Sequence, residues 1–390
     1  MEKFNTIINR RGTNSVKWDM YSENDLLHAW VADMDFASPK EIQDALLHRV
    51  EHGVFGYTFS GDNVRNAIKA WMQKRHKWHI KKDWIVFQSG VVPSLSSAIQ
   101  AFTKQNDRIL IQTPVYPPTF DMVTLNGREL ANSPLVKQNG TYEMDFADLE
   151  RHFQQGVAMM VLCSPHNPVG RVWTKPELER LGELCERYDV LVVSDEIHSD
   201  IILKGHVHIP FAALPSLSKR TITCIAPSKT FNIAGLQAAA VIIENEQLRK
   251  PFSDVLRRQG FHALNMFAST AMEAAYTQCE NWLEDLLLYL EENVRFACSY
   301  IEKELPELTV YRPEGTYLLW IDCQKLNLPR KERLSLLQRQ GKIVVEPGEK
   351  FGFGGEHFIR LNLGCPKAML KDVLAGLKKA VFFHMNSQKA

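Results

Sequence analysis

Three short polar segments, each directly after an apolar run, hold the residues best suited to chemistry. They are 164–170 (SPHNPVG), 194–198 (SDEIH) and 226–232 (APSKTFN). If the apolar runs are strands, then the amide of Asn167, the carboxylate of Asp195 and the amine of Lys229 stand at the tips of three strands. Open parallel sheets bind ligands at the edge formed by the carboxyl ends of their strands. The pattern therefore predicts a ligand site at that edge.

Each of these residues alone has an ordinary structural explanation. A Ser-Lys pair is usually part of a surface loop, N-P-V-G is usually a turn, and an Asp after a buried strand is often a helix N-cap. Their joint occurrence in this order, each at the end of a strand, favours a shared functional role.

In the order N-P-x-G, D-E and S-K, the three segments resemble the fold-type I pyridoxal-phosphate enzymes, the aminotransferase superfamily. The resemblance implies that Lys229 forms a Schiff base with the cofactor aldehyde, which needs a lowered lysine pKa so that free amine is available. It implies that Asp195 keeps the pyridinium nitrogen protonated, so that the ring can accept electrons. Asn167 would donate to the phenolic oxygen of the ring, with His198 on the same side.

Longer blocks narrow the resemblance. They are 30–36 (WVADMDF), 114–117 (PVYP), 164–173 (SPHNPVGRVW), 195–198 (DEIH) and 228–237 (SKTFNIAGLQ). Together they resemble the cystathionine β-lyase-like carbon–sulfur lyases, the MalY/PatB group that includes cystalysin, over about residues 4 to 382. The resemblance implies cleavage of the Cβ–S bond of cystathionine or related cysteine S-conjugates, which yields a thiol, pyruvate and ammonia.

The resemblance also assigns the residues that bind the cofactor. Tyr116 would stack on the ring and join Lys229 and Asp195 as a catalytic residue. The phosphate would be bound by the backbone N–H groups of Gly90, Val91 and Val92 at a helix N-terminus, where the macrodipole favours an anion, and by the hydroxyl of Ser228. Tyr57 would reach the phosphate of a neighbouring subunit, which implies a homodimer with shared active sites.

For the amino-acid substrate, the resemblance implies binding by Arg360, Asn167 and Ala32. Arg360, in the block FIRLN, would hold the α-carboxylate with its two-pronged guanidinium. The alternative is that Arg360 is an exposed strand residue.

Two other functions use the same fold. An aminotransferase shares the cofactor and the lysine, because both reactions begin with removal of the Cα proton. Gln237 favours the lyase, since many aminotransferases have an arginine eight positions after the lysine. The second alternative is a regulatory or binding protein built on this fold, against which the intact Asn167, Asp195 and Lys229 argue.

The elements around these motifs alternate between strand and helix. Short apolar runs rich in Val and Ile, without polar alternation, predict strands buried on both faces; they are 84–88, 108–112, 157–163, 190–194, 221–226 and 238–243. Helical patterns at 176–188, 282–305 and 366–383, and strand patterns at 316–322, 342–346 and 358–363, complete the prediction. A capping box at Ser38, with Pro39 in the first helical position, predicts a helix that ends near His52.

The fold class expected is therefore α/β: a fold-type I enzyme with a large domain of mostly parallel sheet flanked by helices and a smaller α+β domain. With 390 residues, the chain is long enough for two domains. We expect the large, cofactor-binding domain over residues 48–285 and the small domain over residues 1–47 together with 286–390.

Composition excludes several other classes of protein. The 46 Lys and Arg residues balance 45 Asp and Glu. The chain therefore lacks the excess of positive charge that is typical of nucleic-acid-binding proteins. Residues 1–12 lack the apolar core of a secretory signal, and no apolar run approaches the roughly 20 residues that span a bilayer. The seven cysteines are widely spaced, without a C-x-x-C pair, which is typical of free thiols in the reducing cytoplasm.

We expect no metal site. The sequence 48–52 (HRVEH) matches an inverted zinc-protease motif, but Gly53 is expected to end its helix and no third ligand is evident. The pair His206 and His208 is interpreted as an exposed loop pair, and the charged run 330–333 as a solvated helix face. The glycine-rich stretch 351–355 is expected to be a mobile loop near the substrate entrance.

Overall fold

The structure is a computed structural model that describes residues 2–21, 23, 25–138 and 140–388. Its larger sheet has seven strands in the order β2 (Ile85–Gln88), β10 (Ala239–Ile242), β9 (Thr221–Ile225), β8 (Leu191–Asp195), β7 (Val157–Cys163), β3 (Arg108–Ile111) and β4 (Glu129–Asn132). All neighbouring pairs are parallel except those of β10, which is antiparallel to both β2 and β9. The predicted strands of the mostly parallel sheet are confirmed, with ends that differ by no more than one residue.

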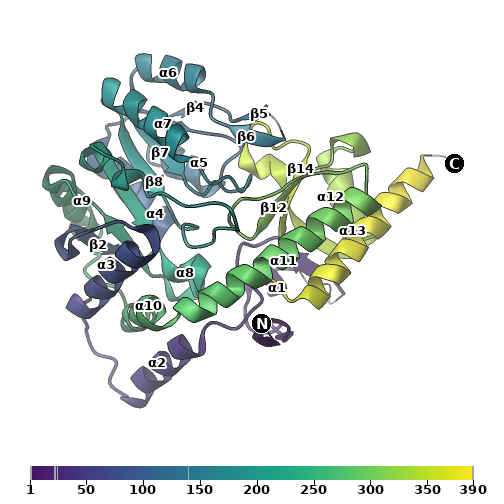
Figure 1. Ribbon diagram of the computed structural model, residues 1–390, viewed down its shortest axis with the longest axis horizontal. Coiled ribbons are helices and arrows are strands. Elements are labelled where there is room, and N and C mark those ends of the chain that lie inside the picture. Colours follow the sequence, from purple (N-terminus) through teal and green to yellow (C-terminus); the bar gives the residue numbers. More distant parts are fainter. Residues whose placement is uncertain (1, 22, 24, 139, 389–390) are drawn as a thin grey trace.

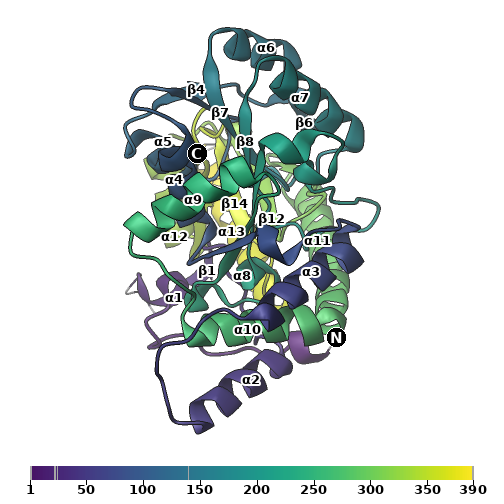
Figure 2. The ribbon, with the colours of Figure 1, turned by 90° about the vertical axis from the view of Figure 1, so that its left-hand side faces the viewer.

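Helices cover both faces of this sheet because its strands are apolar on both sides. Met159 and Val161 of β7 pack with α4 (Val91–Phe102), α5 (Pro118–Thr124) and α9 (Glu246–Arg258). The alternate residues Met160 and Leu162 pack with α6 (Phe146–Gln154) and α7 (Lys175–Arg187). Figure 2 shows α4 and α9 on one side of the sheet and α7 on the other. The period of two along β7 thus supplies two separate cores.

The smaller sheet has five strands in the order β1 (Leu27–Ala29), β13 (Ile343–Pro347), β14 (Phe358–Asn362), β12 (Leu318–Asp322) and β11 (Thr309–Tyr311). Here β1, from the N-terminal part of the chain, pairs in parallel with β13. The C-terminal part therefore does include an N-terminal segment, as expected. The boundaries after residues 47 and 285 remain predictions.

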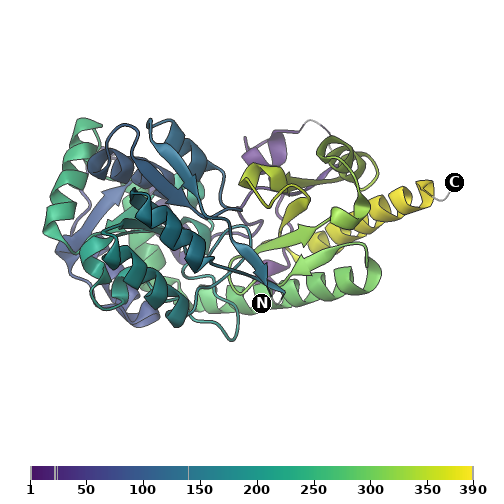
Figure 3. The same cartoon turned by 90° about the horizontal axis from the view of Figure 1, so that it is seen from above.

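The remaining elements connect and cover the two sheets. They are α1 (Val16–Asp19), α2 (Lys40–Glu51), α3 (Asp62–His76), α8 (Pro227–Thr230), α10 (Met266–Gln278), α11 (Glu280–Glu304), α12 (Arg330–Arg339), α13 (Lys367–Ser387) and the hairpin β5 (Val136–Gln138)–β6 (Thr141–Glu143). The long helix α11 runs from α10, beside the larger sheet, to α13 and the smaller sheet (Figure 1). Seen from above, the two sheets form two lobes (Figure 3). No helix in the described part of the chain is apolar over a stretch long enough to cross a membrane.

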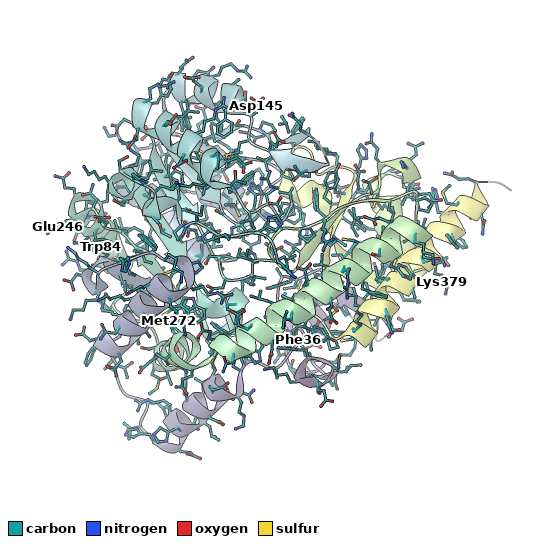
Figure 4. The ribbon with its side chains drawn as sticks, in the orientation of Figure 1. Phe36, Trp84, Asp145, Glu246, Met272 and Lys379 are labelled. Atoms are coloured by element: carbon teal, nitrogen blue, oxygen red, sulfur yellow. The ribbon has the colours of Figure 1, made fainter. Side chains whose placement is uncertain are left out.

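One hydrophobic cluster joins the two lobes. It includes Phe36, Met272 of α10 and Leu290 of α11, all buried. Figure 4 labels Met272 on α10, in the large lobe, and Phe36 beside the long helix α11; Asp145 and Lys379 lie far from both, at the top of the large lobe and on α13. Because this cluster spans both lobes, packing fixes how they sit relative to each other.

The capping box predicted at Ser38 is wrong. Pro39 is the N-cap of α2, and no side chain caps that end of the helix. The hydroxyl of Ser38 instead donates to the carbonyl oxygen of Asn232 at 3.0 Å. A complete capping box does occur at α7, where Thr174 and Glu177 bond reciprocally to each other's backbone N–H groups. The Ser38 hydroxyl thus bonds to the loop after α8 instead of capping the N-terminus of α2.

Candidate active site

A cavity of about 190 Å³ lies at the carboxyl ends of the strands of the larger sheet. It brings together all but two of the predicted site residues, namely Ala32, Gly90, Val91, Val92, Tyr116, Asn167, Asp195, His198, Ser228 and Lys229. Asn167 and Asp195 are carried on or directly after the adjacent strands β7 and β8, and Lys229 follows β9. The parallel topology therefore gathers Asn167, Asp195 and Lys229 at one edge of the sheet. Ala32 comes from the segment after β1 of the smaller sheet, 197 positions before Lys229, and contacts the lysine through its carbonyl oxygen.

Lys229 is a half-buried lysine without an ion-pair partner in the described structure. Its Nζ donates to the carbonyl oxygen of Ala32 at 2.7 Å, and no carboxylate lies within salt-bridge distance of it there. Burial lowers the pKa of Lys229 to about 8. A lysine in this state supplies free amine near neutral pH, which is what attack on a carbonyl carbon requires.

Neighbouring side chains hold the turn that carries Lys229. The hydroxyl of Thr230 donates to Asp200 at 2.9 Å. Two residues further on, the side chain of Asn232 accepts from the N–H of Met34 and donates to the carbonyl oxygens of Met34 and Phe36. These bonds fix both the lysine and the segment whose carbonyl oxygen accepts from it.

Asp195, at the end of β8, is a buried carboxylate. Burial raises its pKa to about 6, and the N–H of Ile197 donates to its Oδ1 at 3.1 Å. A carboxylate that is desolvated but poorly compensated gains from a nearby cation. Asp195 is thus suited to hold a protonated ring nitrogen.

Arg360, on β14, lies beside the cavity rather than in its lining. Its Nη1 donates to Oδ1 of Asn167 and its Nη2 to the carbonyl oxygen of Trp30, both at 2.9 Å. The side chain is 3% exposed, which is incompatible with the alternative of an exposed strand residue. Among the described residues, the guanidinium forms bonds only to neutral groups. Its charge is therefore available for a carboxylate.

The first turn of α4 offers an anion site. Gly90 is its N-cap and provides no side chain to bond the free N–H groups of the helix. Gly90, Val91 and Val92 line the cavity, with Ser228 in the first turn of α8 nearby. Free N–H groups at a helix N-terminus, together with a hydroxyl, are a common phosphate-binding arrangement.

Tyr116 and His198 form part of the cavity wall. Burial raises the pKa of Tyr116 and lowers the pKa of His198 to about 3, which keeps the imidazole neutral. The Nδ1 atom of His198 is buried and has no hydrogen-bond partner. A buried polar atom without a partner among the described residues, in a side chain that lines a cavity, calls for an explanation such as a bound ligand.

Tyr57 is the predicted residue that lies farthest from this arrangement. It is fully exposed on the segment between α2 and α3 and does not line the cavity. Within one chain it makes no contribution to the site, which agrees with a role toward a second copy and leaves that role a prediction.

Sequence reasoning missed the residues that hold the segment around Ala32 in place by hydrogen bonds. Asn362 donates to the carbonyl oxygens of Val31 and Asp33, and the hydroxyl of Tyr317 donates to that of Ala32 at 2.9 Å. Since Asn362 is two residues after Arg360 on β14, the strand period places both on one face. That spacing was a usable signal. Cys163 and Ile197 also line the cavity, and nothing in their types indicated it.

Several interpretations of other motifs need correction. His208 is buried and its Nε2 lies 2.9 Å from Oε2 of Glu196, so it is not an exposed loop residue. Arg333 is buried as well and bonds Glu349 and the carbonyl oxygen of Glu356, whereas Arg330 is exposed as expected. In the described part of the chain, no group of three or more His, Cys, Asp or Glu residues could hold a metal ion.

Taken together, the lining fits a phosphorylated pyridine that carries an aldehyde. It combines a free amine, a buried carboxylate, an amide, an aromatic ring and an anion site within one cavity. The neutral His198 with its open Nδ1 adds a polar contact of the kind such a ring can use.

Comparison with known proteins defines the class first. The family described as "Aminotransferase class I and II" matches residues 22–377, so the chain belongs to that family. The chain is 46% identical to cystathionine beta-lyase PatB of Bacillus subtilis, with 95% of this chain and 98% of PatB covered. It is 35% identical to protein MalY of Escherichia coli, with 98% and 99% covered.

A solved structure gives the same result. Cystalysin from Treponema denticola, described as containing a pyridoxal 5'-phosphate cofactor, superposes with a TM-score of 0.95 at 36% identity, covering 97% of this chain and 98% of cystalysin. Within its family, the chain thus belongs to the PatB/MalY subgroup of cystathionine β-lyases and C–S lyases. The predicted resemblance and the fold-type I architecture are confirmed.

Proposed function

We propose that this protein is a pyridoxal-phosphate-dependent carbon–sulfur β-lyase that cleaves L-cystathionine or related cysteine S-conjugates to a thiol, pyruvate and ammonia. The observation that carries the proposal is that one cavity holds both the amine of Lys229, which has no ionic partner among the described residues and a lowered pKa, and the buried carboxylate of Asp195, which has a raised pKa. The relative PatB, at 46% identity over nearly the full length, is named a cystathionine β-lyase.

The residues divide the work of the reaction among them. When bound, the cofactor supplies an aldehyde for the amine of Lys229 and a ring that takes up the electron pair released at Cα. Arg360 binds the substrate α-carboxylate and orients the Cα–H bond. The freed amine of Lys229 removes the Cα proton as a general base. Asp195 keeps the ring nitrogen protonated, and loss of the thiolate from Cβ follows.

The remaining residues hold the cofactor in place. The first turn of α4, with Gly90, Val91 and Val92, and the hydroxyl of Ser228 bind the phosphate. Tyr116 would stack on the ring, and the amide of Asn167 would donate to its phenolic oxygen. Gln237 lies in the cavity lining at the position where many aminotransferases have an arginine. The phosphate then depends on backbone N–H groups rather than on a guanidinium.

The active form is a homodimer, in which Tyr57 of each chain reaches the phosphate site of the other. An apolar surface supports this assignment: Leu47, Val54, Phe55, Tyr57 and Phe59 are all exposed on α2 and the segment that follows it. Exposed apolar residues gathered along one segment are typical of an interface.

We place the protein in the cytoplasm. All seven cysteines are free and buried, which is typical of a reducing compartment.

Pyruvate release from cystathionine, with pyridoxal phosphate present and no keto acid, tests the function. The proposal requires sustained release over many turnovers. Product that forms only when a keto acid is added would identify an aminotransferase instead. A protein that binds the cofactor and forms neither product would be a binding or regulatory protein on this fold.

A further inference from the structure

An ion pair beside Arg360 has no part in the functions assigned so far. Glu346 on β13 is the cross-strand partner of Arg360 on β14, and Trp320 on β12 is its partner on the other side. Directly paired residues of antiparallel strands present their side chains to the same face of a sheet. Glu346, Arg360 and Trp320 therefore form a row across the smaller sheet, on the face that presents Arg360 to Asn167.

One end of this row is closed. Trp320 is 1% exposed and stacks on Phe358 with ring centroids 4.7 Å apart, and its ring also contacts Phe351 edge-on. Phe351 lies under the guanidinium of Arg360, 4.9 Å from ring centroid to Cζ. A substrate bound to Arg360 therefore has no room on the Trp320 side. Its side chain must extend elsewhere.

The other end of the row carries opposite charges and reaches solvent. Oε1 of Glu346 lies 2.7 Å from Nζ of Lys350; the Glu346 side chain is 10% exposed and that of Lys350 45%. The same Nζ lies 6.0 Å from the centroid of the Trp30 ring, and the carbonyl oxygen of Trp30 accepts from Arg360. The pair thus lies between the buried Arg360 and the surface.

Glu346 does not pair with Arg360, although the two are directly opposite each other. Burial lowers the pKa of Arg360, and Glu346 is the largest of the charges that oppose this shift. Glu346 therefore acts on the site electrostatically while its own partner is a surface lysine. Because Lys350 is half-exposed, its ammonium can exchange partners at little cost, whereas the carboxylate of Glu346 is buried and gains from any cation placed beside it.

We propose that Glu346 and Lys350 form a subsite for the distal end of the sulfur substrate, with Glu346 binding a distal ammonium and Lys350 a distal carboxylate. This inference rests on the proposed function and narrows its substrate class to conjugates whose leaving thiol is itself an amino acid. When such a zwitterion binds, the ion pair between Glu346 and Lys350 is replaced by two others: Glu346 with the distal ammonium and Lys350 with the distal carboxylate. The net charge of the subsite therefore stays at zero. An anionic side chain without an ammonium meets the carboxylate of Glu346 and is disfavoured.

The test uses four cysteine S-conjugates that differ in distal charge: cystathionine carries both charges, S-(2-aminoethyl)cysteine an ammonium, S-(2-carboxyethyl)cysteine a carboxylate and S-methylcysteine neither. The value of kcat/KM for pyruvate release is measured with the wild-type holoenzyme, Glu346→Gln and Lys350→Met. The control is Glu304→Gln, which breaks a Glu–Lys pair of the same 2.7 Å length with Lys378, on α11 and α13.

The subsite predicts changes in ratios between substrates. In Glu346→Gln, kcat/KM for the aminoethyl conjugate relative to the methyl conjugate falls about tenfold, the size expected for one charge-assisted hydrogen bond. In Lys350→Met, kcat/KM relative to the methyl conjugate falls for cystathionine and for the carboxyethyl conjugate. It does not fall for the aminoethyl conjugate. Glu304→Gln leaves all ratios as in the wild type.

Two outcomes overturn the subsite. Equal losses on all four conjugates in Glu346→Gln would make Glu346 a positioning residue for Arg360, and unchanged ratios in both variants would remove any role in recognition. Lys350 is half-exposed, so Lys350→Met keeps the test valid if Glu346→Gln does not fold. If the wild-type protein releases no pyruvate from any of the four, the proposed function fails rather than the subsite alone.

Discussion

Two clusters of charged side chains contact or include residues of the segment 30–36. The charges of the first cluster are paired with one another, whereas those of the second are not. In the first, Lys17 and Arg10 meet the carboxylates of Asp33 and Asp35: Lys17 lies 2.6 Å from Asp35, and Arg10 lies 2.6 Å from Asp33 and 2.8 Å from Asp35. In the second, the hydrogen bonds of Lys229 and Arg360 within the described part of the chain go to carbonyl oxygens of the same segment and to the amide of Asn167.

The difference separates structural from functional charge. A buried ion must be paired because its desolvation is costly, and the first cluster satisfies that rule with two cations and two anions. Among the described residues, the second leaves a lysine, an arginine and Asp195 without ionic partners, so that a ligand can supply them. The cost appears as the lowered pKa of Lys229 and the raised pKa of Asp195. Shifts of this kind gather at functional sites.

The largest effect expected is on activity, from Lys229→Ala. Removal of the amine takes away both the group that binds the aldehyde and the base at Cα, so pyruvate release should fall by a factor of about 10⁴ or more. Since the amine has no ionic partner, the variant should unfold at the same temperature as the wild-type apoprotein or higher. Residual turnover above a trace would contradict this role.

The opposite result is expected from Lys17→Met. The side chain is 1% exposed, and its loss leaves Asp35 without one of its two cations. Breaking a buried ion pair in this way costs about 3–5 kcal/mol of unfolding free energy, measurable by urea denaturation. The control, Lys3→Met, breaks an exposed pair with Asp285 and should cost less than about 1 kcal/mol. A loss as small as that of the control would remove the distinction between the clusters.

Asp195→Asn separates charge from shape in the cavity. The amide keeps the size of the carboxylate but cannot hold a proton on the ring nitrogen, so kcat should fall about a hundredfold. Cofactor affinity, measured by fluorescence titration, should fall as well. The raised pKa also predicts that cofactor affinity of the wild type weakens as the pH drops through about 6, where Asp195 becomes protonated. Affinity that is flat between pH 5 and 7 would contradict this assignment.

Arg360→Lys should have a smaller effect, mainly on KM. Lysine keeps the positive charge but loses the planar fork that can bind a carboxylate with two hydrogen bonds. We expect KM for cystathionine to rise about tenfold, with the cofactor still bound. An unchanged KM would show that the α-carboxylate binds elsewhere.

The sequence predicted the strands better than the residues whose hydrogen bonds hold the segments around the site. Apolar runs rich in Val and Ile identify buried strands such as β7 exactly, because burial on both faces leaves no polar residue inside them. The motif residues at the strand ends followed from that topology. Tyr317 did not, since its hydrogen bond goes to a carbonyl oxygen of segment 30–36, far away in the chain. Asn362 bonds carbonyl oxygens of the same segment, and its spacing of two from Arg360 was the one signal for it. Bonds to backbone carbonyls leave no charge pattern in a sequence.

The sequence also could not decide whether Arg360 is buried or exposed. Strand period could place it on a face of β14 but could not tell which face is buried. His208 was misjudged in the same way, because its partner Glu196 lies at the end of a different element.

The most direct test of the contrast between the two clusters is the pKa of Lys229 in the apoprotein. Acetylation rates of individual lysines between pH 6 and 11, followed by mass spectrometry, give this value, with exposed lysines near 10.4 as the internal reference. The lowered pKa means that the folded state binds fewer protons than the unfolded state between about pH 8 and 10.5, so stability should rise with pH across that range. We predict a pKa of about 8 for Lys229. A value near that of the exposed lysines would contradict the account, because it would mean that the amine is neither desolvated nor held ready for its ligand.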